Sequence, residues 1–268
     1  MGKKTQHPIL NTLINLISQR LITVLALFLG TGLLIVFSNL QSSDGFIIIP
    51  KYIYSNSVIS LPPLSPSKPH PLPPTLSQWQ DSTNSGDYFS QVITTQVGYL
   101  VWSKFPIRVY VEPPKAISEK QAQLWVNSVL QGVQEWNTYL PLIIVEQPEI
   151  ADITIARKVP PLQISPDSNI PRARSAQTTY ELYTKNKVLS HRFTILLSPS
   201  QTGNYLIAAT RHEFGHALGI WGHSPLQTDA LYFSQVRNPS LISIRDVNTL
   251  KRVYEQPTSL GWSLAEFP

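Results

Sequence analysis

The residues best suited to do chemistry lie between positions 212 and 223, where the sequence reads HEFGHALGIWGH. His212 and His216 are four residues apart, so on a helix their imidazoles lie one turn apart on the same face. Both rings can then direct a nitrogen to one Zn²⁺ ion. Glu213 follows the first histidine and could reach a water at the metal without binding the metal itself. The spacing therefore predicts a metal site with a general base beside it.

Gly219 and His223 extend this pattern. Glycine adopts a positive φ at low cost, so Gly219 can end the helix and turn the chain back. His223 would then be a third nitrogen ligand, and the open fourth position is what separates a catalytic zinc site from a closed structural one. A chance occurrence of H-E-x-x-H on an ordinary helix is the alternative, and the added glycine and histidine favour the metal site.

Composition excludes several other kinds of site. The 268 residues contain no cysteine, which excludes disulfides, thiolate metal ligands and a lipid anchor on cysteine. The formal charge is +5, but only 14% of the residues are charged. The basic residues are scattered and form no stripe with interleaved aromatic residues. We therefore expect no nucleic-acid partner.

The uncharged run 21–37 (LITVLALFLGTGLLIVF) predicts a membrane anchor, because its length reaches the short end of a transmembrane helix. The basic residues before it are Lys3, Lys4 and Arg20, so the positive-inside rule leaves the N-terminus in the cytoplasm. A cleaved signal peptide is the alternative, but no A-x-A site follows. We expect an uncleaved single-pass anchor in the lipid bilayer over 21–40, with the rest of the chain extracytoplasmic.

The chain is thus expected to divide into four parts: a cytoplasmic segment (1–20), the anchor (21–40), an extracytoplasmic linker (41–80) and a folded domain (81–268). Within the linker, residues 61–75 (LPPLSPSKPHPLPPT) are rich in proline, which favours extended polyproline II over helix or central strand. We interpret this stretch as a semi-rigid spacer between the bilayer and the domain.

The sequence of the domain predicts helices and strands that could position the histidines. Alternation over 105–111 (FPIRVYV) predicts a strand. Ser118 opens a capping box before a long amphipathic helix, whose apolar face carries Trp125, Val129, Val133 and Trp136. Further strands are expected at 142–146 and 152–156.

A hairpin is expected from 175–183 and 188–197. His191 in its second arm has no acidic or histidine neighbour in sequence, so a role outside the metal site is expected. The zinc-binding helix spans 204–218, and a capped C-terminal helix follows. The expected fold is α+β, with a mixed sheet over the long helix and the zinc-binding helix.

Residues 102–254 resemble the metzincin zinc peptidases, and within them the matrixins. They also resemble predicted membrane-anchored matrixin-like proteases of cyanobacteria, in the HEFGHALGIWGHS stretch and in Thr228-Asp229. The resemblance implies a zincin catalytic domain, one Zn²⁺ ion and hydrolysis of peptide bonds in a protein or peptide substrate. It also implies that the strand at 177–183 is the sheet edge on which a substrate aligns as an extra strand.

Two positions depart from the metzincin pattern. The third histidine of that family stands one residue earlier, where this sequence has Gly222, and a one-residue bulge there would let His223 reach the metal. The family also keeps a methionine beneath the zinc. Leu231 stands at that place and Tyr232 follows it, and a leucine of similar size can serve the same packing role. Without cysteine, latency through a cysteine switch is impossible.

The resemblance implies that Glu213 takes a proton from the attacking water and passes it to the leaving amine, with zinc as the Lewis acid. Tyr232 could assist at the oxyanion. The expected function is a membrane-anchored zinc-dependent metalloendopeptidase. Two alternatives stay open: a gluzincin with Glu255 as the third ligand, and a catalytically inactive, zinc-containing membrane-tethered binding or scaffold protein, which would have no use for Glu213.

Overall fold

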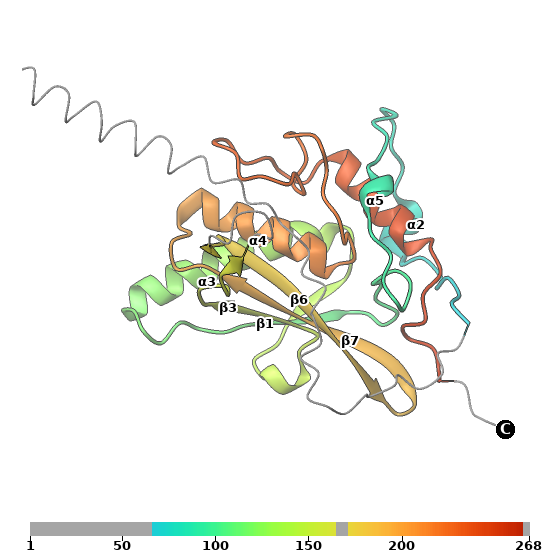
Figure 1. Cartoon of the computed structure of the whole chain (residues 1–268), viewed down its shortest axis with the longest axis horizontal. Helices are drawn as coiled ribbons and strands as arrows, with labels where there is room; N and C mark the ends of the chain where they lie inside the picture. The colour runs from blue at the N-terminus through green and yellow to red at the C-terminus, as the bar shows by residue number, and fades with distance from the viewer. Residues whose placement is uncertain (1–65, 165–170, 265–268) are drawn as a thin grey trace, which may run out of the picture. The chain divides into compact units, whose positions relative to one another are not determined.

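The computed structural model describes residues 66–164 and 171–264 (Figure 1). These residues form an α+β fold with a mixed five-stranded sheet and several helices, as the sequence predicted. The expected cytoplasmic segment 1–20 and anchor 21–40 lie outside the described residues. Within the described ranges, no helix is both long and apolar enough to cross a membrane.

The main sheet has the strand order β2-β1-β3-β7-β6. Its members are β1 (Ile107–Val111), β2 (Leu142–Ile144), β3 (Ile153–Arg157), β6 (Ala176–Lys185) and β7 (Val188–Leu197). Strands β1, β2, β3 and β7 pair in parallel, and β6 runs antiparallel to β7 at one edge. The predicted strands are therefore present. A second, small sheet pairs β4 (Gln163–Ile164) with β5 (Pro171–Arg172).

The hairpin of β6 and β7 has a two-residue turn at Asn186 and Lys187, whose φ angles are 51° and 61°. Two successive residues with positive φ are typical of the type I′ turn, whose twist matches that of the flanking strands. This short turn fixes β6 beside β7 and leaves the other side of β6 at the sheet edge. The hairpin prediction is confirmed.

Two helices cover one face of the sheet: α3 (Glu119–Gln134) and α4 (Gly203–Ala217) (Figure 1). The Ser118 side chain accepts a hydrogen bond from the Gln121 backbone N–H, so the predicted capping box is formed. Helix α3 contacts α4, and α4 in turn contacts β6 and β7. The helix that carries the predicted metal ligands thus lies between the long helix and the hairpin.

The core lies between this sheet face and the helices. The buried side chains of β7 follow the period of a strand, with Leu189, His191, Phe193, Ile195 and Leu197 directed inward. Trp136 and Phe214 fill the space under the helices and are fully buried. A capped C-terminal helix, α5 (Ile244–Tyr254), closes the domain as expected.

Residues 66–80, which the sequence analysis assigned to the linker, pack against the domain. Lys68 and Thr258 exchange backbone hydrogen bonds of 3.1 Å. A short helix, α2 (Pro74–Gln78), then buries Leu76 completely. Proline is tolerated at the first position of a helix, because the N–H that it lacks has no intrahelical partner there. Over this part, the proline-rich stretch is a docked segment of the domain instead of a free spacer.

Candidate metal centre

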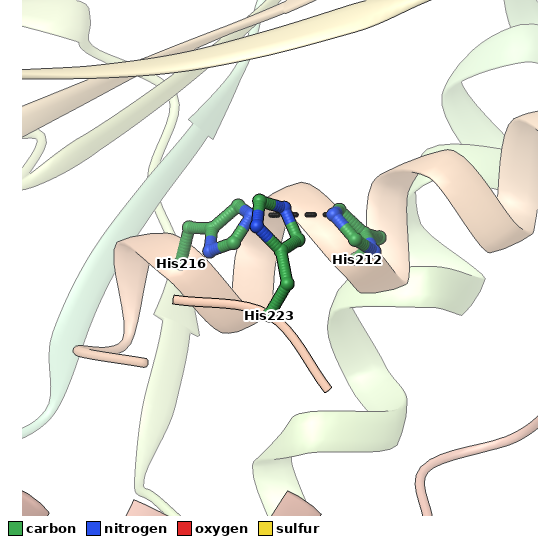
Figure 2. Close-up of side chains that lie close together, drawn as sticks. All are labelled: His212, His216 and His223. Atoms are coloured by element: carbon green, nitrogen blue, oxygen red, sulfur yellow. Dashed lines mark hydrogen bonds between the residues drawn. The ribbon is translucent and has the colours of Figure 1, made fainter. Parts of the chain in front are cut away.

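Three histidine side chains converge at the end of α4. His212 and His216 lie one turn apart on the helix, and His223 follows on the segment after it (Figure 2). Their candidate ligand atoms all lie within 4.8 Å of one another. The structure therefore brings together the three residues that the sequence predicted as ligands, in a group that could hold a metal ion.

A helix C-cap motif at Gly219 returns the chain toward the helix. Gly219 has a φ of +123°, and its N–H donates to the His216 carbonyl oxygen at 3.0 Å. The next N–H, of Ile220, reaches back to the Gly215 carbonyl oxygen at 3.1 Å. This pair of bonds defines a Schellman motif, which favours glycine because of the positive φ. The predicted helix stop is confirmed, and it carries the chain back to His223.

Residue 222 must be glycine because its backbone lies close to another segment of the chain. Residue 222 forms an isolated antiparallel bridge with Val92, and the Ile93 N–H donates to the Trp221 carbonyl oxygen at 2.9 Å. A Cβ atom on residue 222 would overlap the carbonyl oxygen of Gln91. Glycine therefore stands at the position where the metzincin pattern has its third histidine, and His223, one residue later, joins the histidine group.

Backbone carbonyls fix the proton on two of the three rings. Nδ1 of His212 lies 2.9 Å from the Ala230 carbonyl oxygen, and Nδ1 of His216 lies 2.7 Å from that of Ile220. A carbonyl oxygen only accepts hydrogen bonds, so each Nδ1 carries the proton, and in a neutral ring Nε2 then carries none. Such carbonyl partners are typical of metal-binding histidines. Both Nε2 atoms are therefore free to bind a metal.

The Nε2 atoms of His212 and His216 lie 3.2 Å apart, a contact that Figure 2 marks with a dashed line. They could share a hydrogen bond only if one ring held a second proton. For the His216 ring, burial opposes this, because it holds the pKa of His216 well below its ordinary value, with the neighbouring histidines adding to the effect. When both rings are neutral, their two unprotonated Nε2 atoms at this distance fit a cation between them.

His223 completes the donor set. Its Nε2 is buried and has no hydrogen-bond partner among the described residues. Desolvation, followed by the nearby His212, lowers the pKa of His223 to about 3, so its ring is neutral. Neutral imidazole is the form that binds metal ions. An orphaned buried nitrogen beside two further acceptor nitrogens fits a resident metal ion.

Glu213 lies outside the donor group and is held by the edge strand. Thr178 on β6 donates its hydroxyl to Glu213 Oε2 at 2.6 Å and to the Glu213 carbonyl oxygen at 3.0 Å. Burial raises the pKa of Glu213, and His212, Thr178 and Arg174 partly offset the increase. The carboxylate is thus fixed beside the histidines by a strand that is distant in sequence.

Thr178 and Arg174 were not predicted as partners of Glu213. Thr178 is 35 residues from Glu213 in the chain, and no local motif links them. The one sequence signal for Thr178 is the strand prediction for 175–183, which placed this residue on the expected substrate edge. Because strand alternation does not specify which helix residue a strand faces, only the packing of α4 on β6 reveals the contact.

A turn beneath the histidines forms an apolar floor. Leu231 is fully buried, and its side chain packs over Gly215 of α4. The Asp246 carboxylate accepts the backbone N–H groups of Ala230 at 2.8 Å and of Leu231 at 3.3 Å. The Ala230 carbonyl oxygen is the partner of His212. Asp246 therefore orients His212 through one peptide unit, and the place of Leu231 beneath a bound zinc ion stays a prediction.

Other candidate residues lie apart from the histidine group. Glu255 lines a cavity of about 320 Å³ with Asp81 and Asp87, so it is not among the residues gathered at the metal centre. His191 is buried and stacks on Trp102, in agreement with its expected role outside the metal site. Tyr232 packs its ring on a neighbouring phenylalanine, and its proposed help at an oxyanion stays a prediction.

Comparison with known proteins adds no family assignment. A scan against protein-family models finds no match to this chain, and a search of curated proteins finds none either. The metzincin resemblance of residues 102–254 therefore stays a prediction from sequence. The geometry of the three histidines and Glu213 does not depend on it.

Proposed function

We propose that this chain is a membrane-anchored zinc-dependent metalloendopeptidase with His212, His216 and His223 as metal ligands and Glu213 as general base. One observation carries the proposal: three convergent imidazoles stand beside a carboxylate that is not part of the donor group. Structural zinc sites are closed by four protein ligands, whereas three ligands leave a position for substrate or water. A site that serves folding alone has no use for the neighbouring carboxylate.

The donor set favours zinc. Three neutral imidazole nitrogens suit zinc, copper, iron or nickel better than the oxygen-seeking magnesium or calcium, and three-histidine zinc sites are catalytic. When bound, zinc would polarise the scissile carbonyl and supply a water of lowered pKa. The chain's own part is to hold the ligands, since backbone carbonyls at Ala230 and Ile220 fix two of the rings.

Glu213 would accept the proton of the attacking water and return it to the leaving amine. The Thr178 hydroxyl holds Oε2, so Oε1 is the oxygen that faces the reaction in this proposal. Burial raises the pKa of Glu213, which brings a carboxylate closer to the range in which a general base works efficiently near neutral pH. Thr178 is thus proposed as a positioning residue for the base.

A substrate peptide is proposed to bind along β6. This strand lies at the edge of the sheet, where its backbone can pair with an added strand. Thr178 connects the same strand to Glu213, so a peptide on β6 would run past the base. Together with the turn at Gly219 and the floor at Leu231, this arrangement supports the metzincin-like, matrixin-like assignment.

The membrane anchor, and the side of the membrane on which the domain lies, are proposed from the sequence alone. The uncharged run 21–37 supports a single anchor, and the basic residues before it support a cytoplasmic N-terminus. The described domain, residues 66–264 with a gap at 165–170, would then act on protein or peptide substrates outside the cytoplasm.

The test uses the full chain, unfolded casein as substrate and zinc analysis of each variant. Glu213→Gln should keep about one zinc per chain and lower kcat/KM by about 10²–10⁴-fold, because it removes only the proton acceptor. His223→Ala should lose both zinc and activity. Glu255→Gln, the same kind of change away from the histidines, should retain both.

Three results would contradict the proposal. Full activity of Glu213→Gln would exclude this residue as the base. Loss of zinc in Glu255→Gln with zinc retained in His223→Ala would instead identify a glutamate third ligand. A wild-type chain that holds zinc but cleaves no peptide bond, with or without a chelator, would favour the inactive scaffold protein.

A further inference from the structure

The loop that follows the third proposed metal ligand, residues 224–231, is closed at its base by two hydrogen bonds. Ser224 comes directly after His223, and its backbone N–H donates to the Leu231 carbonyl oxygen at 2.8 Å. The Ser224 hydroxyl donates to Oδ2 of Asp229. Both Ser224 and Asp229 are buried. A buried carboxylate therefore holds the residue that follows a proposed metal ligand.

Arg245, in the first turn of α5, fixes the Asp229 carboxylate from the other side. Its Nε donates to the same Oδ2 atom at 3.0 Å. The two terminal nitrogens donate to the backbone carbonyl oxygens of Ser85 and Asp87, each at 3.1 Å. Because the guanidinium is a rigid planar fork, three such contacts leave it little freedom to move. The carboxylate is thus held in place by α5 and, through Arg245, by the N-terminal part of the domain.

His223 depends on its flanking residues more than the other two histidines do. His212 and His216 lie on α4, and a backbone carbonyl oxygen faces Nδ1 of each ring. His223 lies on the segment after the helix, so its place is set by how that segment is held on either side. Gly222 is held on one side by its bridge with residue 92, and Ser224 is held on the other by the carboxylate.

We infer that Asp229 is a positioning residue for the third metal ligand, His223, and that it acts through Ser224. The inference rests on the proposed function, because it assumes the metal centre that this function requires. Without the carboxylate, the buried Ser224 hydroxyl loses its acceptor and Arg245 loses its charged partner. The base of the loop can then shift, and the His223 imidazole shifts with it. Groups that orient metal ligands in this way typically change metal affinity by about 10–100-fold when they are replaced.

The test titrates the metal-free full chain with Zn²⁺ against a competing chelator and records the visible spectrum of the chain loaded with Co²⁺. Asp229→Ala should weaken zinc binding by about 10–100-fold and change the Co²⁺ spectrum, because one nitrogen ligand is displaced. Asp229→Asn should lose less affinity than Asp229→Ala. Both hydrogen bonds fall on Oδ2, while Oδ1 has no partner among the described residues, so a single amide oxygen can accept both.

Three further variants separate positioning from general loss of stability. Ser224→Ala removes the same contact but keeps the ion pair of Asp229, so it serves if Asp229→Ala does not fold; it should weaken zinc binding by about three- to tenfold. Arg252→Gln breaks another ion pair of α5, with Asp87 at 2.9 Å, and should leave zinc affinity unchanged. Leu76→Ala removes a core side chain that takes no part in these contacts, so it should lower the melting temperature without changing zinc affinity.

Wild-type zinc affinity and an unchanged Co²⁺ spectrum in Asp229→Ala, or in Ser224→Ala if the former does not fold, would overturn the inference. A loss of zinc affinity in Leu76→Ala as large as that in Asp229→Ala would also overturn it, because the effect would then follow stability alone. A wild-type chain that binds no zinc would refute the metal centre and this inference together. A wild-type chain that binds zinc but cleaves no peptide bond would refute the peptidase and leave the role of Asp229 to be decided by the variants.

Discussion

His191 should make the domain sensitive to acid. Its ring is 3% exposed and stacks on Trp102 with ring centroids 4.0 Å apart, and Nε2 has no partner in the described structure. Burial lowers the pKa of His191 to about 3, and the charge of Asp152 only partly offsets this effect. The imidazole is therefore neutral in the folded protein and cannot be protonated without loss of its packing or a large cost in free energy.

The size and sign of the effect follow from linkage. The pKa in the folded state is lower than the ordinary value of 6.5, so protons bind preferentially to the unfolded chain. The contribution of neutral His191 to the free energy of unfolding is complete above pH 6.5 and is lost as the pH falls toward 3. Each pH unit in this window costs about 1.4 kcal/mol, so His191 should reduce the free energy of unfolding by about 2 kcal/mol at pH 5.

The variant His191→Phe removes this titration and keeps an aromatic ring against Trp102. Urea unfolding followed by tryptophan fluorescence would be measured for both proteins between pH 5 and pH 8. We expect the two free energies of unfolding to agree within about 1 kcal/mol at pH 8, with the variant gaining about 2 kcal/mol on the wild type at pH 5. The other histidines are the same in both proteins, so their effects cancel in the difference. A difference that stays constant with pH would refute the reasoning.

Two further predictions concern the segments that shape the metal centre. Gly222→Ala should lower the free energy of unfolding by about 1–3 kcal/mol, because the new Cβ overlaps the Gln91 carbonyl oxygen, and should weaken zinc binding by displacing His223. Thermal melting measures the first effect and zinc titration the second. Unchanged zinc affinity would argue against this account. Leu231→Ala should cost about 2–5 kcal/mol through the cavity it leaves. Leu231→Met should cost less than about 1.5 kcal/mol, and equal losses in both variants would contradict a packing role for the floor.

The sequence predicted the elements whose signals are local. The i, i+4 histidines, the helix stop at Gly219 and the hairpin of β6 and β7 each depend on residues within a few positions of one another. The capping box at Ser118 is of the same kind. Such features form because backbone geometry and short-range hydrogen bonds are set within one or two turns of chain. For that reason the helix and strand predictions agree with the structure to within a few residues.

The docking of residues 66–80 was not predictable in this way. Proline content argues against regular structure but says nothing of what an extended segment contacts. Leu76 is buried in the core, and Lys68 forms a bridge with Thr258, which is far from it in the chain. The segment therefore belongs to the domain for reasons of packing that its own composition does not contain.

Sequence alone determined which side chains could form the metal centre: two histidines on one helical face, a third after a glycine turn, and a glutamate beside the first. Only the tertiary structure decided how they are held. Thr178 on a distant strand fixes Glu213, and the turn held by Asp246 supplies the Ala230 carbonyl to His212. These partners come from segments that meet only when the sheet, α4 and α5 pack together, so no spacing in the chain could specify them.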